Sequence, residues 1–390
     1  MIYLDYAATT PVHPRVLEAM LPYFRETFGN PSSIHRFGQK AESALEMARE
    51  KVAAVLHCRP DEILFTSCGS ESDNLALRGG ALAQRKAIGA AQIVTAKNEH
   101  HAVSRTAEQL EKEHGFSVNW LALDEHGAVT PTSFKDSLTS ETALVSVMYA
   151  NNEIGTVNPI AELSVFARSH NRDNNSNVIF HTDAVQAAAY LDVNTQILGV
   201  DLMSLGGHKF YAPKGVGALY VRKGTGLIPH LTGGGQEFGL RAGTQNIPYI
   251  VGFAEALHLA AEERESRTTH VKPLRDHIIG QVLETIPDSQ LTGHPQNRLP
   301  NHASFVFKDV DGNFLLQLLD SAGFACSSGS ACKTGNPEPS EVISALGFSR
   351  DWALGSLRIT LGMDSTPEGV ESFLKTLPSL VEKARKINHR

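Results

Sequence analysis

A lysine follows two glycines and an apolar run near the middle of the chain. Gly206, Gly207 and His208 precede Lys209, and Phe210 follows it. Glycines permit sharp turns and let a backbone approach a ligand closely. A lysine amine displayed at such a turn can form a Schiff base with an aldehyde cofactor. The alternative is an ordinary surface lysine after a turn, so this pattern needs support from other residues.

An aspartate closes another apolar run. Val178–Phe180 continues through two polar residues to Asp183, and Gln186 lies three residues further on. The carboxyl ends of strands in open α/β sheets are where ligands bind. A carboxylate there can pair with a pyridinium nitrogen and keep it protonated, which makes the ring an electron sink. An aspartate that only caps a turn is the simpler alternative.

Two further runs are followed by residues suited to a phosphate and to an aromatic ring. The segment Thr66–Asn74 leads into a helical pattern and contains Gly69 and Ser70. Small residues at a helix start free backbone N–H groups for an anion, although Ser70 can equally be an ordinary N-cap. His100 follows the run Ile93–Thr95. Its imidazole could lie flat over a cofactor ring.

Asn152 follows the run Leu144–Met148 and could supply an amide donor. Each of these patterns has a purely structural explanation when it is taken alone. Together, the strand ends deliver a phosphate loop, a stacking ring, a pyridinium partner and a Schiff-base lysine. These are the groups that pyridoxal 5'-phosphate requires. The sequence therefore predicts an enzyme that uses this cofactor.

Alternating elements must position these residues. Short apolar runs of strand length alternate with helical patterns through the first two thirds of the chain. This alternation predicts βαβ units and a mainly parallel sheet with helices on both faces. The expected strands are 62–66, 93–95, 144–148, 178–180, 202–205, 216–221 and 303–307, and the expected helices include 40–56, 102–113, 160–170, 250–266, 312–321 and 340–347.

The pattern changes near residue 250, where a long helical segment begins. We expect an α/β fold with two domains. Residues 15–254 would form a large cofactor-binding domain on the mainly parallel sheet. Residues 1–14 and 255–390 would form a smaller α+β domain.

Composition narrows the class of protein. The chain has 390 residues, of which 42% are hydrophobic, and its formal charge is −7. A general nucleic-acid-binding surface would usually show a basic excess, so no direct nucleic-acid partner is expected. The N-terminus lacks a signal-peptide pattern and no apolar run reaches the length of a membrane span. The four cysteines, Cys58, Cys68, Cys326 and Cys332, have no zinc-site or redox spacing, which favours a reducing, cytoplasmic location and no metal site.

The ordered motifs resemble the fold-type I enzymes that use pyridoxal phosphate, and within them the class V aminotransferase-like group. The most similar type is the cysteine desulfurase of the IscS/NifS kind. The resemblance runs from LDYAATTP through TSCGSESDN, NEHHAV, NNEIG, HTDAVQ and GGHKFYAPKG to SSGSAC and LRITLG. It implies conversion of L-cysteine to L-alanine, with the sulfur passing to Cys332 as a persulfide. Acceptor proteins, such as an iron–sulfur scaffold or thiolation enzymes, would then take the sulfur. A selenocysteine lyase or an aminotransferase on the same scaffold is the alternative.

The resemblance also assigns roles by motif. Lys209 resembles the Schiff-base lysine, and His100 resembles the stacking histidine, which is also a candidate acid or base. Asp183 matches the pyridinium partner, while Asn152 and Gln186 match residues near the ring hydroxyl. The phosphate cradle would consist of Gly69, Ser70, Gly206, Gly207 and His208.

Two further matches concern a dimer and the substrate. Thr244 matches a residue that the family offers across a dimer interface to the other subunit's phosphate, which implies a homodimer. Arg358 resembles the arginine that grips the substrate carboxylate, together with Asn152. A guanidinium suits this task because it binds a carboxylate bidentately. The alternative for Arg358 is an ordinary salt bridge between domains.

Cys332 resembles the sulfur-accepting cysteine of the family. Its glycine, serine and alanine neighbours predict a mobile loop, and Lys333 could lower the pKa of the thiol. Cys326 lies six residues earlier. It could form a disulfide, accept the persulfide or simply pack, and Phe324 and Ala325 favour packing because they suggest a strand there.

Overall fold

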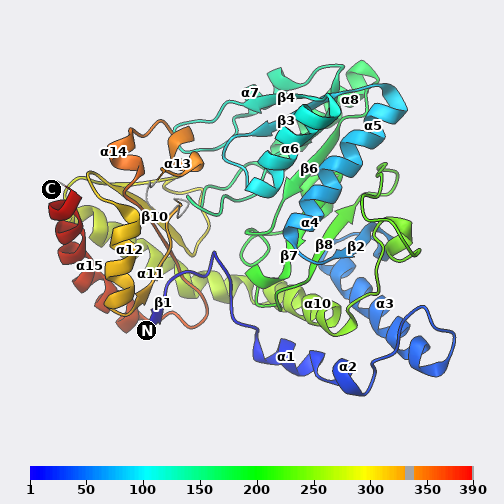
Figure 1. Cartoon of the computed structure of the whole chain (residues 1–390), viewed down its shortest axis with the longest axis horizontal. Helices are drawn as coiled ribbons and strands as arrows, with labels where there is room; N and C mark the ends of the chain where they lie inside the picture. The colour runs from blue at the N-terminus through cyan, green and yellow to red at the C-terminus, as the bar shows by residue number, and fades with distance from the viewer. Residues whose placement is uncertain (330–337, 389–390) are drawn as a thin grey trace.

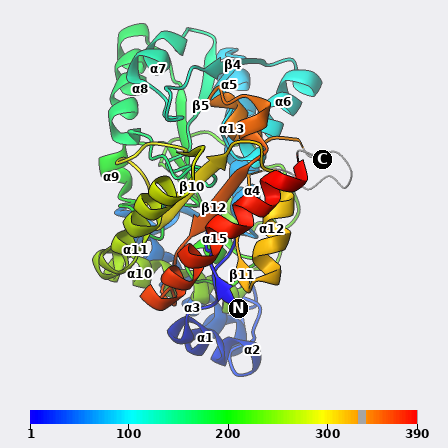
Figure 2. The same ribbon diagram turned by 90° about the vertical axis from the view of Figure 1, so that its left-hand side faces the viewer.

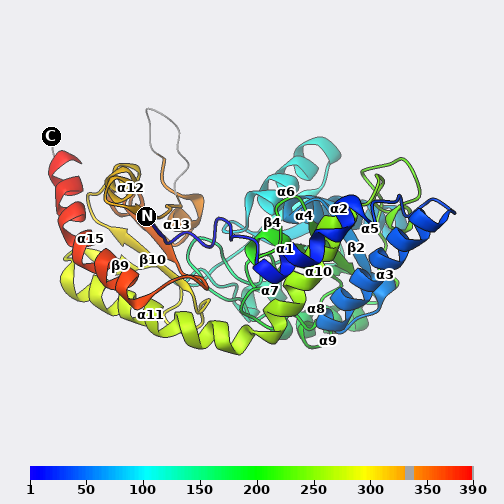
Figure 3. The same ribbon diagram turned by 90° about the horizontal axis from the view of Figure 1, so that it is seen from below.

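The computed structural model describes residues 1–329 and 338–388. Figure 1 shows a larger part built around a seven-stranded sheet and a smaller part built around a three-stranded sheet. Helix α10 (Ile247–Glu262) packs on α3 (Arg36–Leu56) in the larger part. Helix α11 (Arg264–Thr285) follows directly and runs beneath the smaller part in Figure 3.

The large sheet has the strand order β2-β8-β7-β6-β5-β3-β4. Strand β8 is antiparallel to both its neighbours, and all other adjacent pairs are parallel, which confirms the prediction of a mainly parallel sheet. The carboxyl ends of β2, β3, β5, β6 and β7 consequently meet at one edge. The strands are β2 (Ile63–Thr66), β3 (Gln92–Ala96), β4 (Ser117–Leu121), β5 (Thr142–Ser146), β6 (Ile179–Asp183), β7 (Leu202–Gly206) and β8 (Gly217–Val221).

Side chains alternate across this sheet with the two-residue period of a strand. Ile93 belongs to one buried apolar cluster and its neighbour Val94 to another, and Leu144 and Val145 divide in the same way. Helices therefore cover both faces, as the sequence predicts. One face carries α4 (Gly69–Asn74), a π-helical turn (Leu75–Gly79), α5 (Gly80–Ile88) and α6 (His101–His114), and the other carries α3, α8 (Ile160–Asn174) and α10.

The smaller part contains the antiparallel sheet β12-β10-β9 and the parallel pair β1-β11. Helices α11 and α15 lie side by side in Figure 2, which faces this part. The strands are β1 (Ile2–Tyr3), β9 (Ser289–Leu291), β10 (His302–Phe307), β11 (Phe324–Ala325) and β12 (Ser356–Thr360), and the other helices are α1 (Pro14–Met20), α2 (Pro22–Arg25), α7 (Pro131–Ser137), α9 (Thr195–Leu198), α12 (Gly312–Ser321), α13 (Glu341–Ala345), α14 (Arg350–Ala353) and α15 (Pro367–Asn388).

The N-terminal segment joins the two parts. Strand β1 pairs with β11, so the strand expected at Phe324 and Ala325 is confirmed. Asp5 then forms an isolated parallel β-bridge with Thr360 of β12. Further along, the backbone N–H of Thr10 donates to the carbonyl of His208 at 2.9 Å. The segment thus runs from the smaller sheet to the edge of the larger one.

Two sequence predictions needed correction. The single helix expected at 250–266 is two helices, because α10 ends at Glu262 and α11 begins at Arg264. The edge strand β4 was not expected, since its short sequence SVNWL alternates polar and apolar residues and is mostly half-buried. The domain limits remain a prediction, and α10 runs through the proposed limit at 254. Within residues 1–329 and 338–388, no helix is long and apolar enough to cross a membrane.

Candidate active site

A cavity of about 250 Å³ lies at the carboxyl edge of the large sheet. Its wall combines the residues that follow five strands with two residues of the N-terminal segment and one from β12. This arrangement explains why the chemistry-bearing residues are so far apart in the sequence. The lining residues are Ala7, Ala8, Cys68, Gly69, Ser70, Asp73, His100, Met148, Ala150, Asn152, Asp183, Val185, Gln186, His208, Lys209 and Arg358.

Lys209 ends the short 3-10 turn that follows β7. Its Nζ donates to the carbonyl oxygens of Ala7 at 2.6 Å and Ala8 at 2.8 Å. Burial, followed by the nearby Arg358 guanidinium, lowers the pKa of Lys209 to about 8, with Asp5 and Asp183 opposing the shift. A substantial fraction of the amine is therefore neutral near pH 8. Neutral lysine amines are the form that attacks an aldehyde.

Asp183 is the last residue of β6 and one of two carboxyl groups on the cavity wall. Its Oδ1 accepts a hydrogen bond from the backbone N–H of Val185 at 2.9 Å. Burial raises its pKa, while His100, this hydrogen bond and Lys209 oppose the rise. A cationic ring nitrogen beside Asp183 would favour the ionised carboxylate.

Asp73 of α4 is the second carboxyl group, and it is only 1% exposed. Burial raises its pKa well above the usual range, with the neighbouring Asp183 next in importance. Its Oδ1 lies 3.7 Å from Nε2 of His181 and has no hydrogen-bond partner in the described part of the chain. His181 is fully buried between Ser146 and Ser204, and burial lowers its pKa to about 3. Burial therefore favours the neutral forms of both Asp73 and the adjacent His181 imidazole.

His100 is the N-cap of α6, which fixes its ring at the cavity. Its Nδ1 accepts a hydrogen bond from the backbone N–H of Ala102 at 3.1 Å. Burial lowers the pKa of His100, and Asp183 opposes the shift. Since Nδ1 is an acceptor, the neutral ring carries its proton on Nε2. This nitrogen could exchange a proton with a group in the cavity.

The start of α4 forms one end of the cavity. Its N-cap, Cys68, makes no side-chain capping hydrogen bond, so the Cys68 side chain leaves the first N–H groups of the helix available. A Cβ atom at Gly69 would lie 2.7 Å from Cγ2 of Val185, and one at Gly206 would lie 3.1 Å from Cγ1. Only glycine allows these segments to approach so closely. The uncapped N–H groups and Ser70 suit a phosphate.

Arg358, in the middle of β12, reaches the cavity from the smaller part of the molecule. Its Nη2 donates to Oδ1 of Asp5 at 2.8 Å, and its Nη1 donates to the carbonyl of Asn152 at 3.0 Å. Nε2 of His302 lies 3.2 Å from the same carbonyl. The arginine is 7% exposed, and its Nε has no partner among the described residues. It therefore forms a salt bridge between segments and still has N–H groups for a carboxylate ligand.

Other predicted residues lie beside the cavity or away from it. Gln186 lines it and donates from Nε2 to the carbonyl of Ala7 at 2.9 Å, which holds the N-terminal segment. Gly206 and Gly207 lie behind its wall, where a Cβ atom at Gly207 would meet Ala212 at 3.0 Å. Thr244 is exposed and does not line the cavity of this chain.

The cysteines differ in their surroundings. Cys332 lies outside the described residues, so its role stays a prediction. Cys326 packs against the main apolar cluster, and burial raises the pKa of its thiol, as expected for a packing residue. Cys68 is half-buried on the cavity wall. Among the described residues, no cluster of three or more histidine, cysteine, aspartate or glutamate side chains is placed to hold a metal ion.

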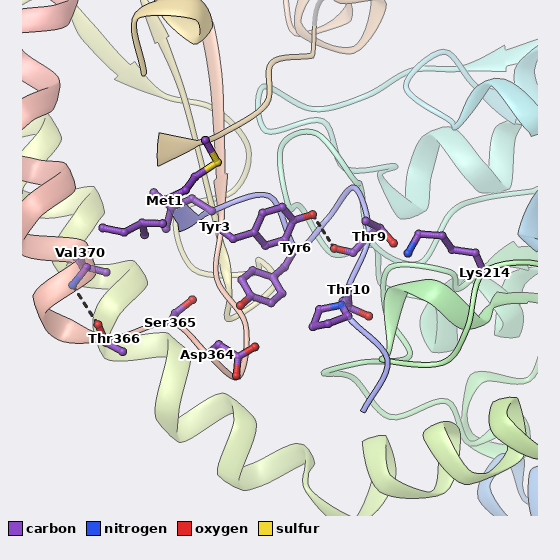
Figure 4. Close-up of a pocket in the computed structure, with 14 residues that line it drawn as sticks. Met1, Tyr3, Tyr6, Thr9, Thr10, Lys214, Asp364, Ser365, Thr366 and Val370 are labelled. Atoms are coloured by element: carbon purple, nitrogen blue, oxygen red, sulfur yellow. Dashed lines mark hydrogen bonds between the residues drawn. The ribbon is translucent and has the colours of Figure 1, made fainter. Parts of the chain in front are cut away.

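A larger cavity of about 620 Å³ lies elsewhere along the N-terminal segment (Figure 4). Tyr3 and Tyr6 line it together with Lys214 and Asp364, and Tyr3 donates from its hydroxyl to the carbonyl of Thr9 at 2.9 Å. It contains neither Lys209 nor Asp183. The smaller cavity is therefore the better candidate for catalysis.

Sequence reasoning missed Asp5, Asp73 and the carbonyls of Ala7 and Ala8. The two aspartates belong to the motifs LDYAATTP and TSCGSESDN, so the sequence could have marked them as candidates for the site. No spacing rule links Asp5 to an arginine that is 353 residues away. Backbone carbonyls have no sequence signature at all.

Comparisons with known proteins agree with this geometry. The family model for aminotransferase class-V matches residues 2–373. A protein named cysteine desulfurase IscS from Dictyoglomus turgidum is 46% identical over 99% of this chain and 96% of its own length. A solved structure described as a NifS-like protein has a TM-score of 0.90 at 37% identity, covering 98% of this chain and 99% of its own. A structure described as SspA in complex with cysteine has a TM-score of 0.79 at 34% identity, covering 93% and 99%.

Proposed function

The chain belongs to the class V aminotransferase family, and we propose that it is a cysteine desulfurase that uses pyridoxal 5'-phosphate. The observation that carries this proposal is the meeting of Lys209 and Arg358 in one cavity. An amine that can bind an aldehyde and a guanidinium that can bind a carboxylate suit an amino-acid substrate. Relatives that are named cysteine desulfurases support L-cysteine as that substrate.

The residues present fit the cofactor. Lys209 would bind its aldehyde, and Asp183 would pair with its ring nitrogen. Ser70 and the uncapped start of α4 would hold its phosphate, aided by Gly69, Gly206, Gly207 and His208. The cavity of about 250 Å³ offers the space, and the unpartnered Oδ1 of Asp73 on its wall is a buried polar atom that a bound polar group could partner. When bound, the cofactor supplies an electron sink for the carbanion formed at the substrate Cα.

The residues of this chain would then act on the substrate as follows. Arg358 binds the carboxylate, and Asn152 lies beside it on the cavity wall. Nζ of Lys209, whose pKa is lowered to about 8, accepts the α-proton at neutral to mildly alkaline pH. His100 lies on the same wall and could move a proton at Nε2. Gln186 holds the N-terminal segment over the site through its hydrogen bond to the carbonyl of Ala7.

Cys332 would take the sulfur. Its thiolate forms a bond to Sγ of the substrate as the Cβ–Sγ bond breaks, and Cβ gains a proton. Overall, L-cysteine and the Cys332 thiol are converted to L-alanine and a persulfide on Cys332. This assignment rests on the SSGSAC motif. Acceptor proteins, such as an iron–sulfur scaffold or thiolation enzymes, would remove the sulfur in a reducing, cytoplasmic setting.

We also propose that the protein is a homodimer in which Thr244 faces the other subunit's phosphate site. Leu17 and Leu21 are 49% and 56% exposed, and Phe24 is 49% exposed, on the neighbouring helices α1 and α2. Exposed apolar patches of this kind mark interfaces. Two ion pairs hold the segment that contains Thr244. Glu237 of this segment pairs with Arg49, and Arg241 pairs with Glu71.

A product assay tests the proposed activity against its alternatives. The holoenzyme is incubated with L-cysteine, L-selenocysteine or a common amino donor, and alanine, sulfide, selenide and 2-oxo acid are quantified. We expect alanine from L-cysteine and no 2-oxo acid. A strong preference for selenocysteine would indicate a selenocysteine lyase, and 2-oxo acid as the main product would indicate an aminotransferase.

A further inference from the structure

Glu153 contacts both ends of the segment for which no structure is described. It follows Asn152 directly and lies between β5 and α8. Its Oε2 accepts a hydrogen bond from Oγ of Ser340 at 2.5 Å. A Cβ atom placed on Gly329 would lie 2.2 Å from the same oxygen. One carboxyl oxygen therefore touches the last described residue before 330 and a residue just after 337.

Ser340, on one side of this contact, is buried and is held in place by hydrogen bonds. Ser340 is 3% exposed and is the N-cap of α13. Its hydroxyl accepts from the backbone N–H groups of Val342 at 3.1 Å and Ile343 at 3.3 Å, so its proton is left for Glu153. Capping and the hydrogen bond to Glu153 therefore fix the same oxygen. The side chain of Glu153 therefore helps to orient the N-cap of α13.

The Gly329 side depends on the absence of a side chain. A Cβ atom at this position would overlap Oε2 of Glu153, so a larger residue would have to displace the carboxyl group from its place beside Ser340. Cys332 is three residues along the chain from Gly329, and three residues span at most about 11 Å. The position of Gly329 therefore limits where the thiol can reach.

The contact adjoins the active cavity. Glu153, Gly329 and Ser340 line a second cavity of about 310 Å³, which shares His100 and Asn152 with the first. The charges that face Glu153 come from different elements. Burial raises the pKa of Glu153 and Glu341 adds to the rise, while the Ser340 hydrogen bond, Arg358 and His101 oppose it. In either protonation state Oε2 can accept from Ser340.

We propose that Glu153 is a positioning residue for sulfur transfer, holding both ends of the segment that bears Cys332. This inference rests on the proposed function. A tethered thiol reacts at an effective concentration set by where its tether is held. Glu153 thus acts on formation of the S–S bond and breaking of Cβ–Sγ, and not on capture of L-cysteine.

Two variants and two readouts test the proposal on the holoenzyme. Glu153→Ala removes the anchor, and Glu153→Gln keeps an oxygen that can accept from Ser340. The first readout is the change in cofactor absorbance when L-cysteine binds. The second is the rate of persulfide formation on Cys332 in a single turnover, followed by alkylation and mass spectrometry. Arg105→Ala is the matched control, because it breaks an exposed ion pair to Glu341 on the same helix α13.

We expect Glu153→Ala to slow persulfide formation by about tenfold, the effect of losing one buried hydrogen bond, with an unchanged absorbance response. Glu153→Gln and Arg105→Ala should stay close to the wild type in both readouts. The proposal is overturned if Glu153→Ala forms persulfide at the wild-type rate, if both readouts fall together, or if glutamine fails as alanine does. Absence of persulfide on Cys332 in the wild type would instead refute the proposed function.

Discussion

The carboxylate of Asp5 lies 2.8 Å from Nη2 of Arg358, and the pair joins the N-terminal segment to β12 at the cavity wall. The arginine also donates to the carbonyl of Asn152. A guanidinium has five N–H donors, so these two contacts do not exhaust it. The salt-bridge and substrate-binding interpretations of Arg358 are therefore compatible. An arginine already held in place loses little freedom when it binds a second carboxylate.

Arg358→Lys should weaken binding of L-cysteine, because an ammonium cannot form the bidentate contact or satisfy Asp5 and Asn152 at once. We expect kcat/KM to fall by about 10–100-fold, the usual cost of disrupting a buried hydrogen-bonded charge. Steady-state alanine formation measures this change. Cysteamine, which lacks the carboxylate, is the control ligand, and its binding to the cofactor should be unaffected. An equal loss for cysteamine would mean that Arg358 acts on Lys209 instead.

Attachment of the cofactor to the apoenzyme should depend on pH through Lys209. Its pKa is lowered from 10.5 to about 8, chiefly by burial, so the reactive neutral amine gains population as the pH rises toward 8. Below this value the attachment rate should fall about tenfold per pH unit, and above it the rate should level off. Stopped-flow absorbance gives the profile. A rate that keeps rising to pH 10 would show that the amine is not perturbed.

The two buried carboxyl groups should respond differently to the same substitution. Asp183→Asn removes the charge expected to pair with the ring nitrogen. We expect a loss of at least about 100-fold in kcat, as for other broken buried charge pairs. Burial, and next the neighbouring Asp183, raise the pKa of Asp73, which favours its neutral form. Asp73→Asn keeps a neutral side chain of similar size and is expected to change kcat by less than about fivefold, or ~1 kcal/mol. A larger loss for Asp73→Asn than for Asp183→Asn would reverse the two roles.

Much of the architecture could be predicted because it is encoded locally. The strand ends that carry Gly69, His100, Asn152, Asp183 and Lys209 follow apolar runs in the sequence, and a parallel sheet brings such ends together. The structure places all five residues on one cavity wall. Their residue types suggested the cofactor, and the family motifs then assigned a role to each residue.

The rest could not be predicted because it depends on long-range contacts. The pairing of Asp5 with Arg358 requires β1, β11 and β12 to be in register. The burial that raises the pKa of Asp73 exists only once α4 covers the sheet. Glu153 was visible within NNEIG, yet its partners Gly329 and Ser340 are set by how the smaller part packs. The edge strand β4 is missed because tertiary pairing, rather than apolar content, defines it.

The segment that carries Thr244 is held by a buried ion pair. Arg49 and Glu237 are 2% and 3% exposed and form two hydrogen bonds, at 3.0 and 3.1 Å. Arg49→Ala should lower the free energy of unfolding by about 3–5 kcal/mol, because it leaves a buried charge unpaired. Calorimetry measures the fall in Tm. Lys272→Ala, which breaks an exposed pair with Asp276, should leave Tm nearly unchanged. Equal shifts would mean that burial adds nothing to the first pair.

The most direct test of the account is a single turnover with L-cysteine on the wild type and on Cys332→Ser. Both proteins should show the same absorbance change when L-cysteine binds, because Lys209 and Arg358 are intact. The wild type should yield equal amounts of L-alanine and of persulfide on Cys332, and the variant should yield neither. Release of alanine and sulfide by Cys332→Ser at the wild-type rate would contradict the assignment of Cys332 as the sulfur acceptor.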